Sequence, residues 1–187
     1  MTKNIILTSP RGKAIFPHLT EADTKFKPEG EYHVKLECKK SESEKLILAI
    51  KNEIAKEVKA QNDVTPNKEI KKTSPGYEVD GEKVVFNFKM KASGTRKSDG
   101  KHFIQKPNLY GADLSPLGPD VQIWGDSILR ITFEPFAWNM PIGIGCTLRI
   151  KSVQVIKLVT GAGASNNLGD QKVEPVVTPE VKQEVSI

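Results

Sequence analysis

Apolar and polar residues alternate along several segments of the chain, which is the pattern of strands with one face in a core. Between residues 31 and 39, Tyr32, Val34, Leu36 and Cys38 alternate with charged residues and His33. Because successive side chains of a strand point to opposite faces, this alternation predicts a half-buried strand. The same pattern predicts strands at 84–91, 129–134 and 146–151. In the last of these the alternation slips near residue 152, which predicts a β-bulge.

One segment has a helical period instead. Between Ser41 and about Ala60, apolar side chains recur at spacings of three and four residues, at Ile47, Ile50, Ile54 and Val58. This spacing predicts one amphipathic helix packed on a sheet. Ser41 followed by Glu44 is the pattern of a capping box, so we expect the helix to begin there.

The remaining segments have no such period. Residues 61–81 contain prolines, glycines and lysines and are expected to form a long exposed loop. Residues 98–100, Ser-Asp-Gly, predict a hairpin tip, followed by a second strand over 101–110. We therefore expect one mainly β domain over residues 1–159, an OB-fold-like small β-barrel with a single helix after the second strand, and a flexible tail over 160–187.

Charge changes this picture, because it is uneven along the chain. The protein has 28 Lys and Arg against 23 Asp and Glu, a net charge of +5. The tail holds two lysines against four acidic residues, a net −2, which leaves +7 for residues 1–159. A basic body with a weakly acidic end is typical of a protein that binds a polyanion. A basic isoelectric point is common among soluble proteins, so this observation alone favours nucleic-acid binding only modestly.

Compartment and membrane signals are weak. Cys38 and Cys146 are too few and too far apart to indicate a disulfide framework, which favours a reducing cytoplasm. The N-terminal apolar run is too short for a signal-peptide core. The longest uncharged stretch, 135–148, is broken by a proline and two glycines and is shorter than a membrane span. We expect a soluble protein without membrane association.

No catalytic or metal centre is predicted. Residues 94–102 have the wrong spacing for a phosphate-binding loop, and His102 stands where such a loop has Ser or Thr. His33 and Cys38 point to opposite faces of their strand, so they cannot share a metal ion. Cys38 and Cys146 are expected to be small buried residues. Spacing does not exclude a Cys-His nucleophilic pair, but neither cysteine has a known nucleophile context. We predict no enzyme, no cofactor and no metal.

The outward positions of the predicted strands are basic. If these strands are neighbours, their side chains form one surface, and the hairpin tip adds further cations. Single-strand binders combine such a surface with aromatic rings on which bases stack. The candidate DNA-binding residues are Lys35, Lys89, Lys91, Arg96, Lys97, Lys101, Tyr110, Arg149, Phe136 and Trp138.

The rings differ in how strongly they suggest stacking. Phe136 and Trp138 point the same way in an extended chain, beside a turn rich in Gly and Pro, and are evenly balanced between a stacking platform and the core. Phe103 is a further candidate ring, whereas Trp124 is expected in the core. Surface lysines are most often simply solvated, so no single one of them identifies the site.

Four segments together resemble a known family. They are 30–36 (GEYHVKL), 86–93 (FNFKMKAS), 136–148 (FAWN followed by GIGCTL) and 152–158 (SVQVIKL). In this order and spacing they resemble strands of the single-stranded DNA-binding proteins of short-tailed bacteriophages, over roughly residues 4–159. The resemblance implies an OB-fold, a homodimer, and binding to phage single strands in replication, recombination and repair, in the cytoplasm of the infected bacterial host. It also implies annealing of complementary strands and contacts with the phage DNA polymerase and helicase-primase.

The resemblance also assigns individual positions. Lys89 falls on a basic DNA contact of the family, Phe136 on a stacking aromatic residue, and Trp138 on the ring beside it. Glu29 stands where a related protein has arginine. The family's tails are strongly acidic and end in an aromatic residue, whereas this tail is weakly acidic and ends in Ile187. The alternative function is therefore a phage structural or accessory interaction protein that kept the barrel without its DNA-binding site.

Overall fold

The computed structural model describes residues 5–66 and 69–160. The elements run in the order β1 (Leu7–Thr8), β2 (Gly12–Asp23), β3 (Glu31–Lys39), α1 (Lys40–Val64), β4 (Tyr77–Asp80), β5 (Lys83–Lys91), β6 (Ser93–Thr95), β7 (His102–Ile104), β8 (Asn108–Tyr110), β9 (Ile128–Met140) and β10 (Gly143–Lys157). Within the described ranges no helix is both long enough and apolar enough to cross a membrane. The predicted tail lies almost entirely outside these ranges.

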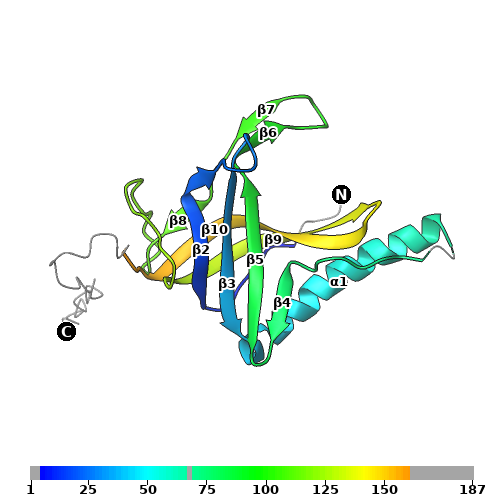
Figure 1. Ribbon diagram of the computed structural model, residues 1–187, viewed down its shortest axis with the longest axis horizontal. Coiled ribbons are helices and arrows are strands. Elements are labelled where there is room, and N and C mark those ends of the chain that lie inside the picture. Colours follow the sequence, from blue (N-terminus) through cyan, green and yellow to red (C-terminus); the bar gives the residue numbers. More distant parts are fainter. Residues whose placement is uncertain (1–4, 67–68, 161–187) are drawn as a thin grey trace, which may run out of the picture.

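Five long strands close into a small barrel. Their order is β9, β2, β3, β5 and β10, and the antiparallel pairing of β9 with β10 joins the two ends of this row. The β5 and β10 strands run parallel, and the other neighbours in the ring are antiparallel. Helix α1 leaves the lower end of β3 and extends to the same side as the β9–β10 hairpin (Figure 1). The predicted mainly β, OB-like barrel with one helix is confirmed. The helix was expected after the second strand and follows β3, which is the second long strand because the short β1 precedes β2.

The apolar residues of the alternating segments fill the interior of the barrel. Val34 and Leu36 of β3, Phe86 and Phe88 of β5, and Phe133 of β9 are fully buried. The Phe88 and Phe133 rings meet edge to face with centroids 5.0 Å apart. Such aromatic pairs add to the free energy gained by burying their area. The predicted burial of Cys38 and Cys146 is also confirmed.

Register shifts interrupt the pairing of the described strands at four points, two between β9 and β10 and two between β2 and β3. The register of β9 with β10 shifts between Ile150 and Ser152, which confirms the predicted bulge. Another shift, which the sequence did not predict, separates Ile15 and His18 where β2 pairs with β3. Phe16 lies in this interval with a φ of 48°, a left-handed conformation that non-glycine residues rarely adopt. Beyond the interval, His18 lies directly opposite His33.

The helix differs from the prediction at both ends. It begins at Lys40 and continues to Val64, and its N-cap, Lys39, makes no side-chain capping bond. The predicted capping box of Ser41 and Glu44 is wrong. Instead, the hydroxyl of Ser43 donates a hydrogen bond to the carbonyl oxygen of Lys39 at 2.8 Å. The strand runs directly into the helix, so no separate capping residue interrupts the backbone.

The helix buries a narrow stripe. Its buried residues are Ser43, Leu46 and Ile50, while Ile47 and Ile54 are partly buried against the core. The helix as a whole packs mainly against β9 and β10, with smaller contacts to β3 and β5.

The predicted loop over 61–81 is only partly a loop. Its first residues belong to α1, and its last include β4, which pairs with β5. Between them the chain lies along the start of β10: the Ile144 N–H donates to the Lys71 carbonyl at 2.8 Å, and the Thr73 N–H donates to the Ile144 carbonyl at 2.8 Å. These non-local hydrogen bonds have no sequence signal.

The predicted hairpin at 98–100 is confirmed, because β6 and β7 pair antiparallel on either side of it. The strand predicted over 101–110 is wrong as one element. It is divided into β7, which pairs with β6, and β8, which pairs with β10. The interval between them carries Pro107, which lacks the N–H that a continuous ladder needs.

Candidate nucleic-acid interface

One row of outward side chains crosses all five strands of the barrel. His18 of β2 lies opposite His33 of β3, which lies opposite Lys89 of β5. Lys89 is in register with Arg149 of β10, and Arg149 lies opposite Glu134 of β9. The row exists because its members alternate with residues such as Phe88, Leu148 and Ile150 that fill the core. Side chains far apart in the sequence thus share one face.

Charges in this row are partly balanced. The Lys89 ammonium lies 3.9 Å from a carboxylate oxygen of Glu31, which also pairs with Lys27. The Lys89 side chain is 40% exposed, so it is open to a ligand on its outer side. At the other end of the row, Lys151 pairs with Glu134 at 2.7 Å. The Lys89–Glu31 contact is long and the lysine is open to solvent, so an anion can compete for Lys89. The Glu134 carboxylate is buried, so it holds Lys151 more firmly.

The four candidate cations on the barrel strands lie around this row; we call Lys35, Lys89, Lys91 and Arg149 the basic face. Lys35 is exposed on β3, opposite Asn87, and Lys91 lies at the upper end of β5 opposite Glu31. None of the ion pairs among the described residues involves Lys35 or Lys91. Their positive charge is therefore not neutralised by a carboxylate in contact with it.

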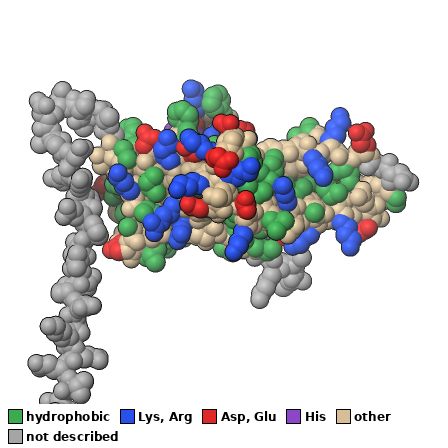
Figure 2. Space-filling model, turned by 90° about the horizontal axis from the view of Figure 1, so that it is seen from below, with side chains coloured by type: hydrophobic (Ala, Val, Ile, Leu, Met, Phe, Trp, Pro, Cys, Tyr) green, Lys and Arg blue, Asp and Glu red, His purple; other side chains and the backbone are tan. Residues whose placement is uncertain are grey.

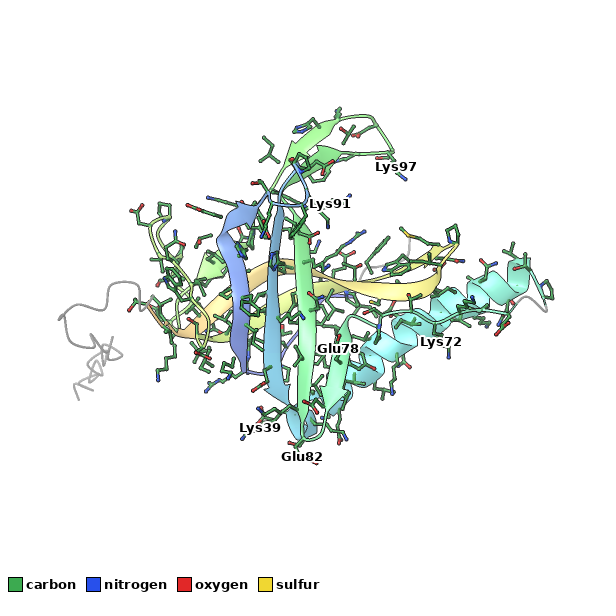
Figure 3. The ribbon with its side chains drawn as sticks, viewed as in Figure 1. Lys39, Lys72, Glu78, Glu82, Lys91 and Lys97 are labelled. Atoms are coloured by element: carbon green, nitrogen blue, oxygen red, sulfur yellow. The ribbon has the colours of Figure 1, made fainter. Side chains whose placement is uncertain are left out.

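The β6–β7 hairpin carries the other three candidate cations. It projects above the barrel, with Lys91 at its base and Lys97 near its tip (Figure 3). Arg96 pairs with Asp99 within the turn at 3.7 Å, whereas no ion pair in the described ranges involves Lys97 or Lys101. The hairpin thus extends the positive charge of the basic face beyond the end of the sheet.

The opposite end of the barrel differs in its charges. Lys39 and Glu82 lie there, at the lower ends of β3 and β5 (Figure 3). Lys39 pairs with Glu42 at 3.9 Å, and Lys83 pairs with Glu37 at 3.1 Å. Viewed from this end, basic and acidic side chains are interspersed (Figure 2). This end does not offer a surface of one sign.

Phe136 and Arg149 form a stack beside the basic face. The centre of the Arg149 guanidinium lies 3.4 Å from the centroid of the Phe136 ring. Phe136 is 39% exposed, so part of its ring remains open to solvent. Burial lowers the pKa of Arg149 from its ordinary value, with the Glu134 carboxylate opposing this effect. A guanidinium remains charged at neutral pH despite such a shift, so the stack presents a cation and a ring together.

Trp138 has a different environment. It is half-buried, and its indole N–H donates a hydrogen bond to the Thr147 hydroxyl at 3.2 Å. It lies opposite Gly145, where a Cβ would overlap the indole ring. Trp138 therefore lies flat on the β9–β10 hairpin and offers less open ring surface than its position in the strand suggests.

The other candidate rings are dispersed. Tyr110 is half-buried in β8 and in register with Gln154, five residues beyond Arg149 along β10. Phe103 covers Gly94 within the β6–β7 hairpin. Trp124, which was expected in the core, is 50% exposed, so that expectation is wrong. Only Phe136 combines an open ring with direct contact to a cation of the basic face.

Sequence reasoning missed two exposed rings, Phe16 and Phe26. Phe26 is 84% exposed, and the Lys25 ammonium lies 5.4 Å from the centroid of its ring. Phe16 is 77% exposed and lies at the irregularity of β2 next to Ile15, which is opposite Lys35. A large apolar side chain held outward on a strained backbone is a candidate contact for a base. The signal available in the sequence was the Ile-Phe-Pro run, which breaks the alternation of its strand.

The cysteines do not supply a nucleophile. Burial raises the pKa of the Cys38 thiol to about 12, and nearby acidic residues act in the same direction. Burial also raises the pKa of the Cys146 thiol to about 12. The thiolate is the reactive form of cysteine, and it is scarcely populated at neutral pH in either residue. The Cys-His hypothesis gains nothing from this geometry.

No family model matches the chain, and no curated protein matches it. Solved structures do match. Gp2.5, a single-stranded DNA-binding protein encoded by bacteriophage T7, superposes with a TM-score of 0.68 at 21% identity, over 87% of this chain and 92% of that one. This chain has the fold of a phage single-stranded DNA-binding protein. The sequence resemblance thus predicted the fold correctly.

A second phage protein supports the same fold. The single-stranded DNA-binding protein of bacteriophage Enc34 superposes with a TM-score of 0.53 at 15% identity, over 86% of this chain and 87% of that one. A structure of that protein in complex with single-stranded DNA gives the same TM-score at 14% identity, over 83% and 88% of the two chains. At these identities the likeness concerns the backbone, so the role of each side chain rests on its geometry in this chain.

Proposed function

We propose that this protein binds single-stranded DNA without sequence preference, along the face that carries Lys35, Lys89, Lys91 and Arg149. The observation that carries the proposal is the stack of Arg149 on Phe136, next to Lys89 in the same row of side chains. The open ring of Phe136 can stack on a base, and the two cations beside it can contact the phosphates. The fold shared with phage single-stranded DNA-binding proteins supports this assignment.

The chemistry explains why binding is indifferent to sequence. Every base has a π face, so stacking on Phe136 does not select among bases. Lysines and arginines contact phosphates, which are the same at every nucleotide. Arg96, Lys97 and Lys101 of the hairpin continue the path beyond Lys91, and Tyr110 and Trp138 lie at the two ends of the β10 segment centred on Arg149. A duplex keeps its bases stacked on each other and cannot use the ring.

The biological role that fits this activity is coating of unpaired DNA in phage replication, recombination and repair, in the cytoplasm of the infected bacterial host. We further propose that the protein acts as a homodimer, promotes annealing of complementary strands, and contacts the phage DNA polymerase and helicase-primase. It performs these roles as a binding protein and not as an enzyme. Residues 1–159 form the DNA-binding domain in this proposal, and residues 160–187 form a weakly acidic tail.

The test is a titration of intrinsic tryptophan fluorescence with oligo-dT and with duplex DNA of equal length. We expect tight binding of oligo-dT, weak binding of duplex, and an affinity for oligo-dT that falls linearly with the logarithm of salt, with a slope of about −0.7 per phosphate contacted. Lys89→Ala should make this slope shallower by less than about one unit. Lys39→Ala, at the opposite end of the barrel, is the matched control and should leave it unchanged.

Two outcomes would contradict the proposal. If the protein binds neither oligo-dT nor natural single strands, the proposed function is wrong, and the alternative of a phage structural or accessory protein is favoured. If binding is tight but independent of salt, the basic face is not the contact surface.

A further inference from the structure

Three side chains at one end of the row could hold a metal ion. His18, Asp23 and His33 each offer one ligand atom, and these three atoms all lie within 4.8 Å of one another. They form the only such group of His, Cys, Asp and Glu among the residues that the structure describes. The sequence did not predict this group, because His18 and His33 are 15 positions apart in the chain and an irregular hairpin joins them.

Two of the ligands are held in place by the backbone. His33 lies in β3, between β2 and β5, and pairs with both. Asp23 ends β2, and one of its carboxylate oxygens accepts the Lys25 N–H at 2.9 Å. Its other oxygen lies 3.3 Å from Nε2 of His33. A separation near this value is what two ligands about 2.0–2.1 Å from a tetrahedral zinc ion require.

The third ligand is aimed by the irregularity of β2. The shift around Phe16 brings His18 opposite His33, and their ring centroids are 4.7 Å apart. His18 is exposed, so its ring can rotate to bring a nitrogen closer to the other two ligand atoms without disturbing the core. The irregularity at Phe16 is what aligns the two histidines, because a regular pairing would not place them opposite one another.

We propose that His18, Asp23 and His33 bind one Zn²⁺ ion at the edge of the basic face. Two imidazoles and one carboxylate are ligands that zinc accepts, whereas Mg²⁺ and Ca²⁺ prefer sites made of oxygen atoms. Three protein ligands leave the fourth position open. Because the site faces solvent, that position can take water or an oxygen of a phosphate group.

The surroundings connect this site to DNA. His33 lies opposite Lys89, and Glu31, which is opposite Asp23, pairs with Lys89 and Lys27. A bound Zn²⁺ adds two positive charges to this edge, and its open position can contact a phosphate directly. We therefore expect zinc to strengthen the binding of single strands, and this expectation rests on the proposed function. The metal site itself does not depend on DNA binding.

The first experiment measures the metal without DNA. Full-length protein without an affinity tag is treated with EDTA, dialysed, and titrated with Zn²⁺ by calorimetry and with Co²⁺ by visible absorption. We expect one Zn²⁺ per chain, and a loss of affinity of about tenfold or more in His18→Asn and in His33→Asn. His102→Asn removes the third histidine of the chain, which lies on β7, and is the matched control that should bind zinc as the parent does.

Circular dichroism of each variant shows whether it is folded, and the exposed position of His18 makes His18→Asn the safer of the two. Zinc binding by folded His18→Asn with the affinity of the parent would overturn the site. So would the absence of stoichiometric zinc binding by the parent.

The second experiment titrates oligo-dT with and without one equivalent of Zn²⁺. We expect the affinity of the parent to rise about twofold to fivefold with zinc, the size of one added exposed ionic contact, and that of His18→Asn to stay unchanged. If oligo-dT does not bind at all, the proposed function fails while the zinc titration still decides the site. If oligo-dT binds equally with and without zinc, the coupling is wrong.

Discussion

Phe136 and Trp138 are two residues apart on the same face of β9, yet their surroundings differ. Phe136 lies opposite Thr147 and stacks on Arg149, with part of its ring open. Trp138 lies on Gly145 and is anchored by its hydrogen bond to Thr147. The difference comes from the neighbouring strand, because β10 offers Phe136 a charged side chain and offers Trp138 a bare backbone.

Position on a strand therefore does not decide whether a ring can stack on a base. Near Trp138, the segment that includes Thr73 runs along β10 and closes the space beside Gly145. Phe136 is 39% exposed, and its ring borders the basic face through Arg149. We therefore propose that Trp138 stabilises the β9–β10 hairpin and that Phe136 contacts DNA.

The largest expected effect is on stability. Trp138→Ala removes a half-buried ring and its hydrogen bond, and leaves a hollow over Gly145. Full burial of such a ring corresponds to about 3–5 kcal/mol, so we expect a loss of about 2–3 kcal/mol in the free energy of unfolding. Urea denaturation followed by circular dichroism measures it. Trp124→Ala, which removes the exposed tryptophan, should cost less than about 1 kcal/mol.

Equal losses of stability in Trp124→Ala and Trp138→Ala would contradict the anchoring role of Trp138. A folded Trp138→Ala protein that has lost most of its affinity for oligo-dT would contradict the division itself, because it would make Trp138 the stacking ring.

The next effect is on affinity. Phe136→Ala removes the ring that stacks on Arg149, and we expect it to cost about 1–3 kcal/mol of binding to oligo-dT with little change in stability. The salt slope should stay the same, because no phosphate contact is removed. Phe136→Leu keeps an apolar side chain without a π face and separates stacking from simple hydrophobic contact. An affinity equal to that of the parent in Phe136→Ala would leave only the cations to hold DNA.

Sequence patterning predicted the parts of the fold that depend on local alternation. Strands β3 and β5 were predicted almost to their ends, because one face of each lies in the core and the period is uninterrupted. The bulge at Ser152 was predicted for the same reason, since it shifts the phase of buried residues. The resemblance to phage proteins supplied the barrel, which alternation alone could only favour over a sandwich.

The site was less predictable, because it depends on which strands are neighbours. The alternation of inward and outward residues placed Lys89 and Arg149 on outward positions, but only the parallel pairing of β5 with β10 brings them together. The stack on Phe136 and the hydrogen bond of Trp138 depend on the register of β9 with β10. The meeting of His18 and His33 depends on a backbone irregularity at Phe16. None of these pairings leaves a periodic signal in the sequence.

The smallest expected effect concerns the geometry of the Arg149 side chain. Arg149→Lys keeps the positive charge but replaces a planar guanidinium, which stacks on Phe136, with an ammonium group that is more strongly hydrated. A cation over an exposed ring contributes about 0.5–1 kcal/mol, so we expect a loss of this order in the affinity for oligo-dT. The salt slope should remain that of the parent, because the charge that contacts phosphate is retained.

Arg149→Ala should instead make the slope shallower by about 0.7. If Arg149→Lys binds as the parent does while Arg149→Ala is weaker, Arg149 acts only as a charge. In the double variant with Phe136→Ala, the effect of Arg149→Lys should disappear, since the ring that gives the guanidinium its advantage is absent.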